Sequence, residues 1–318
     1  MTHSGNLLGV VSDVDELIQL RFQTLGLDLW SGSRVQTYLS GGHHSAFRGR
    51  GIDFDESRYY QPGDDIRHMD WRVTARTGVP HTKVFREERE RPVFLIVDQS
   101  PHMRFGTRVA FKSVIAARTA ALFGWAAVNG GDRVGAFVSG VLPDHEIRPA
   151  GGRRGVLRLI RGLATASAQT LEPDNGANVG LGEVLARVRR VIRPGSLVVI
   201  LSDFAGLDEE TERHLTRLRQ HNDLLACFIY DNLEGTPPPP GRYSVTDGKT
   251  IAVLDMADRQ VRLGYQSGFQ TRLNKTTAVM HSRSIPLWRL ATHQNPVDIL
   301  RRGFAVQAKF APRFRRAS

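Results

Sequence analysis

Two uninterrupted apolar runs, each followed by an aspartate, dominate the pattern of hydrophobic and polar positions. Phe94–Val97 leads into Asp98, and Leu197–Leu201 leads through Ser202 into Asp203. Neither run alternates polar with apolar residues, which is typical of strands buried on both faces of a parallel sheet. In open α/β sheets, ligands bind beyond the carboxyl ends of such strands. We therefore predict that Asp98 and Asp203 lie at the functional edge of a central sheet.

Helical and extended patterns alternate around these two runs. Apolar residues at helical spacing predict helices over 108–128, 156–166, 181–192, 208–221, 258–281 and 297–303, and extended patterns predict strands over 133–139, 146–149, 224–230 and 285–291. This alternation indicates an α/β fold with a doubly wound, mostly parallel sheet of about six strands. Four prolines at 237–240 open a predicted β-hairpin insertion near 236–256.

The first 91 residues follow a different pattern. A helical pattern extends from residue 12 to about residue 40, and a glycine-rich connection follows it. Gln61–Asp64 is a strong turn signal, because proline presets one backbone angle and glycine frees the next. We predict three parts: an N-terminal helix with a small β-rich segment over 1–91, an α/β domain over 92–305, and a basic tail over 306–318.

The composition indicates a folded protein with an excess of positive charge. Of 318 residues 41% are hydrophobic, and the formal net charge is +11. Arginines cluster at 148–161 and in the tail, so the chain is expected to meet an acidic partner or surface. Nucleic acid is one interpretation of this charge. We favour a solvated or partner-facing surface, because no known nucleic-acid-binding motif accompanies the arginines.

Cysteine usage and hydropathy predict a cytoplasmic protein. The single cysteine, Cys227, lies in an apolar run and cannot form a disulfide within the chain, which fits a reducing compartment. The first twenty residues lack the pattern of a signal peptide. The longest weakly apolar run, 120–128, is far shorter than the ~20 residues that a membrane-spanning helix needs.

Several common catalytic motifs are absent from the sequence. There is no G-x-x-x-x-G-K-[ST] phosphate loop, no G-x-S-x-G nucleophile elbow, and no H-E-x-x-H or paired C-x-x-C zinc motif. Asp98, Ser100 and His102 include the residue types of a hydrolase triad, but they crowd one turn. The base of a triad must reach the nucleophile from elsewhere in the fold, so a serine hydrolase is disfavoured.

The two strand-terminal aspartates instead suggest a cation. Two bare carboxylates close together repel each other, and one takes a proton unless a cation lies between them. Carboxylate and hydroxyl oxygens suit a hard divalent ion such as Mg²⁺. If the two runs form neighbouring strands, Asp98 and Asp203 would converge on such an ion.

The residues around Asp98 resemble the metal-ion-dependent adhesion site of von Willebrand factor A domains, D-x-S-x-S after a buried strand. The resemblance implies Asp98, Ser100 and Asp203 as ligands of Mg²⁺ or another divalent cation. His102 replaces the last serine, and a histidine nitrogen favours transition metals. The loop 176–180 lacks the usual threonine. The alternative is a vestigial site in which Asp98 accepts backbone hydrogen bonds and Ser100 caps the next helix.

A longer motif covers residues 51–76. It reads G-x-x-F-x-x-x-R-x-Y-x-P-G-D-D-x-R-x-x-D-W-x-x-x-A-R. The chain thereby resembles the bacterial domain-of-unknown-function family fifty-eight, whose members pair this segment with a von Willebrand A-like domain. The resemblance covers roughly 40–305. It implies a MoxR-type AAA+ ATPase as partner, in chaperone-like assembly or maturation of protein complexes. The mixed charges of the motif are expected to form ion pairs rather than a catalytic site.

Our leading hypothesis is a non-enzymatic adaptor for protein–protein interaction. Its partner would dock on the sheet edge around 98–102 and 203–206, with Gln99, His102 and Phe204 in contact. Two alternatives come from other classes. One is a metal-dependent hydrolase that uses Asp98 and Asp203, and the other is a nucleic-acid-binding protein that uses the basic surface.

Overall fold

The computed structural model forms two compact units, which we describe separately. One unit comprises Met1–Ser31 with Arg91–Ser318, and the other comprises Gly32–Glu90. The structure describes residues 9–27, 29, 52–62, 64–87, 91–141, 144–169, 179–246 and 251–310.

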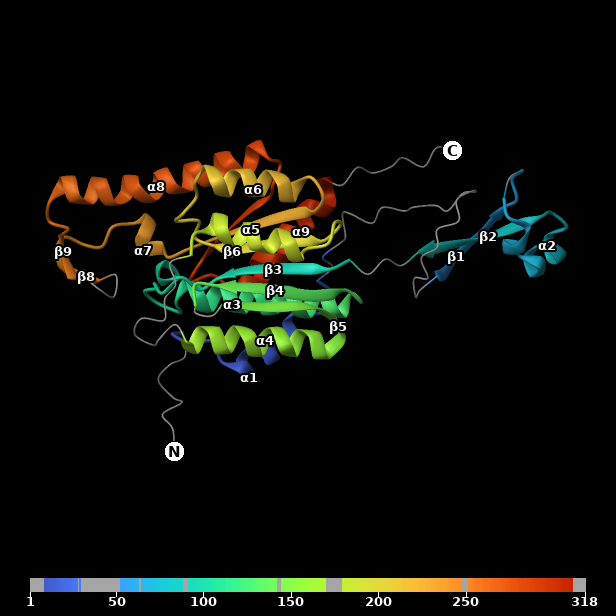
Figure 1. Ribbon diagram of the computed structural model, residues 1–318, viewed down its shortest axis with the longest axis horizontal. Helices are drawn as coiled ribbons and strands as arrows, with labels where there is room; N and C mark the ends of the chain where they lie inside the picture. Colours follow the sequence, from blue (N-terminus) through green and yellow to red (C-terminus); the bar gives the residue numbers. More distant parts are fainter. Residues whose placement is uncertain are drawn as a thin grey trace, which may run out of the picture. The chain divides into compact units, whose positions relative to one another are not determined.

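The larger unit is built on a six-stranded sheet with the spatial order β10-β7-β6-β3-β4-β5 (Figure 1). The strands are β3 (Val93–Asp98), β4 (Arg133–Ser139), β5 (His145–Gly151), β6 (Leu197–Ser202), β7 (Asp223–Tyr230) and β10 (Leu287–Ala291). All neighbouring pairs are parallel except β4 and β5. The predicted α/β class and mostly parallel sheet are confirmed.

Helices cover both faces of this sheet. They are α3 (Lys112–Asn129), α4 (Gly152–Gln169), α5 (Leu181–Val191), α6 (Glu209–Arg219), α8 (Arg259–Ser282) and α9 (Pro296–Phe310). Alternate residues of β3 enter two separate cores: Val93, Leu95 and Val97 pack with α3, α4 and α9, whereas Phe94 and Ile96 pack with α5, α6 and α8. The uninterrupted apolar run of β3 reflects this burial on both faces.

An extension that we call the arm leaves the sheet after β7. It consists of α7 (Asn232–Gly235), β8 (Arg242–Thr246), β9 (Ile251–Asp255) and the first half of α8. β8 and β9 pair only with each other, as an antiparallel hairpin, which matches the predicted insertion. Because the chain enters the arm at the carboxyl end of β7, the arm extends from the carboxyl edge of the sheet (Figure 1).

The N-terminal helix is shorter than predicted and belongs to the larger unit. α1 ends at Gln19 and a 3-10 turn ends at Gln23, so the described residues do not extend the helix toward residue 40. Leu17 is fully buried, and its carbonyl accepts a hydrogen bond from the indole of Trp125 in α3 at 3.1 Å. This packing explains why α1 joins the sheet and not the β-rich segment, although the predicted boundary at residue 91 grouped them.

In its described residues, the smaller unit contains an antiparallel pair of strands and two short helices. β1 (Ile52–Tyr59) pairs antiparallel with β2 (His81–Glu87), and η2 (Ile66–His68) and α2 (Trp71–Thr77) lie between them in the chain. Asp70 caps α2 by accepting a hydrogen bond from the N–H of Val73, and Gly78 ends the helix in the left-handed region.

The C-terminal helix continues into the segment predicted as a basic tail. α9 extends to Phe310, and residues 311–318 lie outside the described part of the chain. Among the described helices, none combines the length and the apolar character needed to cross a membrane.

Candidate functional site

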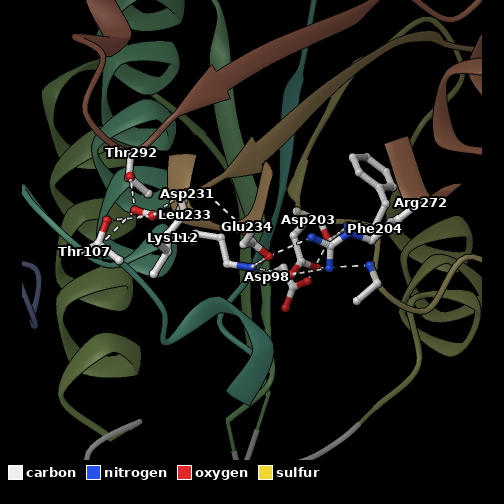
Figure 2. A network of polar contacts seen from close by, with 12 residues as sticks. Asp98, Thr107, Lys112, Asp203, Phe204, Asp231, Leu233, Glu234, Arg272 and Thr292 are labelled. Atoms are coloured by element: carbon white, nitrogen blue, oxygen red, sulfur yellow. Dashed lines mark hydrogen bonds and ion pairs between the residues drawn. The ribbon is translucent and has the colours of Figure 1, made fainter. Parts of the chain in front are cut away.

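The two predicted aspartates meet at the carboxyl edge of the sheet. β3 and β6 are parallel neighbours, with Val97 opposite Leu201. The hydroxyl of Ser202 donates a hydrogen bond of 2.6 Å to Oδ2 of Asp98 and so links the two strand ends. Figure 2 shows Asp98 and Asp203 lying near each other at this edge. The two apolar runs therefore form neighbouring parallel strands, which was the condition for the two aspartates to converge.

Asp98 is held by donors from its own turn and from β6. The N–H of Ser100 donates to Oδ1 at 2.9 Å, as the vestigial-site alternative expected. Ser100 does not cap the short helix η3 (Pro101–Met103) with its side chain. Burial raises the pKa of Asp98, and the nearby charge of Asp203 raises it further, against the hydrogen bonds from Ser202 and Ser100.

Asp203 is neutralised by a buried lysine. Nζ of Lys112, the first residue of α3, lies 2.7 Å from Oδ2 of Asp203, and the two side chains are 2% and 1% exposed. The N–H of Ala205 donates to Oδ1 at 3.0 Å. Burial alone would raise the pKa of Asp203, but the Lys112 ammonium outweighs it and the pKa is lowered. Asp203 is therefore a carboxylate with a cation already beside it.

The ion-pair network extends from Lys112 to the arm. Nζ of Lys112 lies 3.1 Å from Oε1 of Glu234 in α7, and Nη2 of Arg272 in α8 lies 2.6 Å from the same oxygen. The guanidinium carbon of Arg272 also lies 5.7 Å from the ring centroid of Phe269 and 6.0 Å from that of Phe228, within range for cation–π contact. Two cations and two carboxylates thus alternate at this edge (Figure 2).

Asp231 forms a second polar centre where β7 ends. Oδ1 accepts hydrogen bonds from the hydroxyl of Thr107 at 2.7 Å and from the N–H of Leu233 at 2.9 Å. Oδ2 accepts from the hydroxyl of Thr292 (Figure 2). Burial raises the pKa of Asp231, but hydrogen bonds from Thr292 and Thr107 outweigh it, so the pKa is lowered. Asp231 and Glu234 also form a capping box on α7.

Of the three side chains predicted to contact a partner, only His102 is exposed. Gln99 is fully buried, and its amide donates to the carbonyl of Ser113 at 2.9 Å. Phe204 is 1% exposed and stacks on Phe228, with ring centroids 6.3 Å apart. Its φ of 52° is left-handed and costs about 1–2 kcal/mol for a non-glycine residue. Gln99 and Phe204 therefore fix the edge from inside and cannot touch a partner in this conformation.

The residues at this edge do not fit a divalent cation as they are arranged. Each oxygen of Asp98 and Asp203 has a hydrogen-bond donor or the Lys112 ammonium within 3.0 Å. In the described part of the chain, no group of three or more His, Cys, Asp or Glu side chains could hold a metal ion. The loop 176–178, where a further ligand was sought, lies outside the described residues.

The carboxylates of the 51–76 motif serve the local structure of the smaller unit. Asp64 pairs with Arg58 at 2.6 Å and accepts from the N–H of Gln61, which lowers the pKa of Asp64. Asp70 accepts from the hydroxyl of Ser57 at 2.7 Å in addition to capping α2. These contacts agree with the expected structural role of the mixed charges.

Sequence reasoning missed Lys112, Glu234 and Arg272. Lys112 carried a weak signal, since it is a cation in the first turn of a long, mostly apolar helix. Glu234 carried another, because Asp231 and Glu234 have the spacing of a capping box. Arg272 carried none, because only the tertiary fold brings it to the edge.

Comparison with known proteins identifies relatives of unknown activity. The family model described as "Protein of unknown function DUF58" matches residues 56–275, and this is the family that the 51–76 motif predicted. Uncharacterised proteins of Mycobacterium tuberculosis and Mycobacterium bovis are 30% identical over 231 residues, which cover 73% of this chain and 71% of each relative.

Solved structures with some similarity were also found. The conserved hypothetical protein BatB from Bacteroides thetaiotaomicron is 11% identical, with a TM-score of 0.41, over 69% of this chain and 99% of that protein. A von Willebrand factor type A structure from Catenulispora acidiphila is 11% identical, with a TM-score of 0.38, over 72% of this chain and 44% of that chain.

Proposed function

Because the chain belongs to the DUF58 family, we propose that it is a non-enzymatic adaptor that binds a MoxR-type AAA+ ATPase in the cytoplasm. In this role it would bring the ATPase to a protein complex that is being assembled or matured. The class of partner follows from the family resemblance. The observation that carries the proposal is the exposed aliphatic surface of the arm.

The hairpin of the arm exposes apolar side chains to solvent. Ile251 is 79% exposed and Val253 62%, and both lie on one face of β9 because strand side chains alternate. Leu263 on α8 is also exposed, and so is Val245 on β8, which pairs with Ala252 and therefore lies on the other face of the hairpin. A two-stranded hairpin is at best marginally stable alone in water, and grouped apolar side chains on a surface mark protein–protein interaction sites.

The arm lies at the same end of the sheet as the predicted docking edge. His102, Ala205 and Gly206 are exposed there, while the buried network holds the turns that carry them. A partner that contacts the arm could therefore reach both turns. We assign the contact to these exposed residues and give Gln99 and Phe204 a supporting role.

The metal-dependent hydrolase receives less support from the site. A metal-dependent hydrolase needs carboxylates that are free to hold an ion, whereas Asp203 pairs with Lys112 and Asp98 accepts two hydrogen bonds. A divalent cation held by Asp98, Ser100 and Asp203 is therefore not part of this proposal.

The test is a pull-down with a MoxR-type AAA+ ATPase from the same organism, with and without Mg²⁺ and ATP. We expect the wild-type chain to retain the ATPase, and Ile251→Asp with Val253→Asp to abolish retention. Leu25→Asp is the matched control, because Leu25 is an equally exposed aliphatic residue (72%) outside the arm. Retention that is absent in every condition, or that is lost equally in the control, would contradict the proposal.

A further inference from the structure

Lys112 occupies a position that is unfavourable for a lysine by every local criterion. Its side chain is 2% exposed, and burying an ammonium is costly unless it is paired. It is also the first residue of α3, where the helix dipole disfavours a positive charge, and the first turn of α3 contains no acidic residue. Among the residues that the structure describes, the carboxylates across the edge, Asp203 and Glu234, compensate the charge of Lys112.

The four charged groups that pair with one another around Lys112 balance without any added ion. Lys112 and Arg272 face Asp203 and Glu234, and the closest pairs are separated by 2.6 to 3.1 Å. Arg272 also approaches Asp203, with Nη1 3.9 Å from Oδ2. A divalent ion placed among these groups would add charge to a set that is already neutral.

The ammonium also occupies the ligand that an ion would need. Oδ2 of Asp203 is 2.7 Å from Nζ of Lys112, whereas Mg²⁺ requires its oxygen ligands at about 2.1 Å. An ion and an ammonium that share one carboxylate oxygen repel each other, so the Lys112 pair disfavours an ion at Oδ2.

We propose that the Lys112 ammonium is the resident cation of this edge, in the place where the adhesion-site resemblance expects a divalent metal ion. It joins β6 to α7 directly, and through Glu234 and Arg272 it joins α8, so the base of the arm is held to the sheet without any ion from solution. If the adaptor function holds, the docking surface keeps its shape at any concentration of Mg²⁺.

The experiment uses the full-length protein and the metals alone. Elemental analysis of the purified chain should find no stoichiometric divalent ion, and EDTA, Mg²⁺ and Mn²⁺ should leave Tm within about 1 °C. A bound ion at one per chain, whose removal by EDTA lowers Tm, would overturn the proposal. Neither measurement involves the ATPase, so a failed pull-down and a failed ion measurement are distinguishable.

Two lysine variants test the role of the ammonium itself. Lys112→Ser should lower Tm by about 10 °C, because it leaves buried carboxylates without their cation, and Mn²⁺ should restore part of the loss. Lys275→Ser is the control, since Nζ of Lys275 donates to the carbonyl of Leu207 and its charge acts on Asp208, which lies outside this network; it should show no response to metal. An unchanged Tm for Lys112→Ser would overturn the proposal. If that variant does not fold, the wild-type ion measurements decide.

Discussion

The hydroxyl of Ser202 lies 2.6 Å from Oδ2 of Asp98 and joins the carboxyl ends of β6 and β3 by a side-chain hydrogen bond. The same hydroxyl oxygen accepts a hydrogen bond of 3.0 Å from the N–H of Phe204. One buried side chain thus orients the first aspartate of the edge and also sets the direction in which the chain leaves β6.

Replacing this hydroxyl should destabilise the protein measurably. Ser202→Ala leaves Asp98 without one donor and Phe204 without its acceptor, and we expect the free energy of unfolding to fall by about 1–3 kcal/mol. Urea denaturation measures it. Ser267→Ala is the control, because the hydroxyl of Ser267 makes an exposed bond within one turn of α8 and should matter by less than about 0.5 kcal/mol. Equal effects of the two substitutions would contradict this role for Ser202.

Asp231 should make stability fall in acid. Its folded-state pKa is lowered, because the hydrogen bonds from Thr292 and Thr107 outweigh burial. The contribution of Asp231 is therefore fully present above its unfolded pKa of about 3.9 and is lost as pH falls through the lower folded value. Asp231→Asn should destabilise the protein at neutral pH, and the difference from wild type should shrink below about pH 4. Thermal unfolding as a function of pH measures this difference, and a gap that stays constant would count against it.

Gly140 should tolerate no side chain. It has φ of +89°, and a Cβ there would lie 2.2 Å from the backbone nitrogen of Ser100, in the turn that follows Asp98. Gly131 has a similar φ of +83° with open space around it. Gly131→Ala should lower the free energy of unfolding by about 1–2 kcal/mol, because of the left-handed backbone alone. Gly140→Ala should lower it by clearly more. Chemical denaturation measures both variants, and the difference between them is the effect of the close contact between residue 140 and Ser100. Similar losses of stability in the two variants would contradict this effect.

Arg272 should not be replaceable by lysine. Its guanidinium pairs with Glu234 and lies near the rings of Phe228 and Phe269, and a lysine keeps the charge but loses the planar group. We expect Arg272→Lys to lower the free energy of unfolding by about 1 kcal/mol. Arg289→Lys should be neutral, because in the described part of the chain Arg289 makes a long exposed bond to Thr277 and no ion pair. The prediction fails if both arginines tolerate lysine equally.

Local patterns predicted the fold because its central strands are apolar on both sides. The runs 94–97 and 197–201 are buried in the structure as expected, and their terminal aspartates meet because parallel neighbours end at the same edge. The N-terminal helix was predicted to reach residue 40, but α1 ends at Gln19. Apolar spacing alone does not show where a helix ends.

The chemistry of the edge was harder to predict than its position. The pattern of Asp98 and Ser100 suggested oxygen ligands, but whether a carboxylate is bare depends on side chains far away in sequence. Lys112 reaches Asp203 from α3, 91 residues earlier in the chain, and Arg272 approaches it from α8. The burial of Gln99 and Phe204 likewise depends on packing that no local pattern encodes.

The left-handed backbone of Phe204 has a consequence for how a partner would bind. Its ring stacks on Phe228 inside the edge, so the residue from which the turn at 205–206 starts is held by packing. Ordering a loop upon association normally reduces affinity. Here that entropy is already lost when the chain folds, so a protein that docks on this turn meets a preorganised surface and can bind tightly through a small contact area.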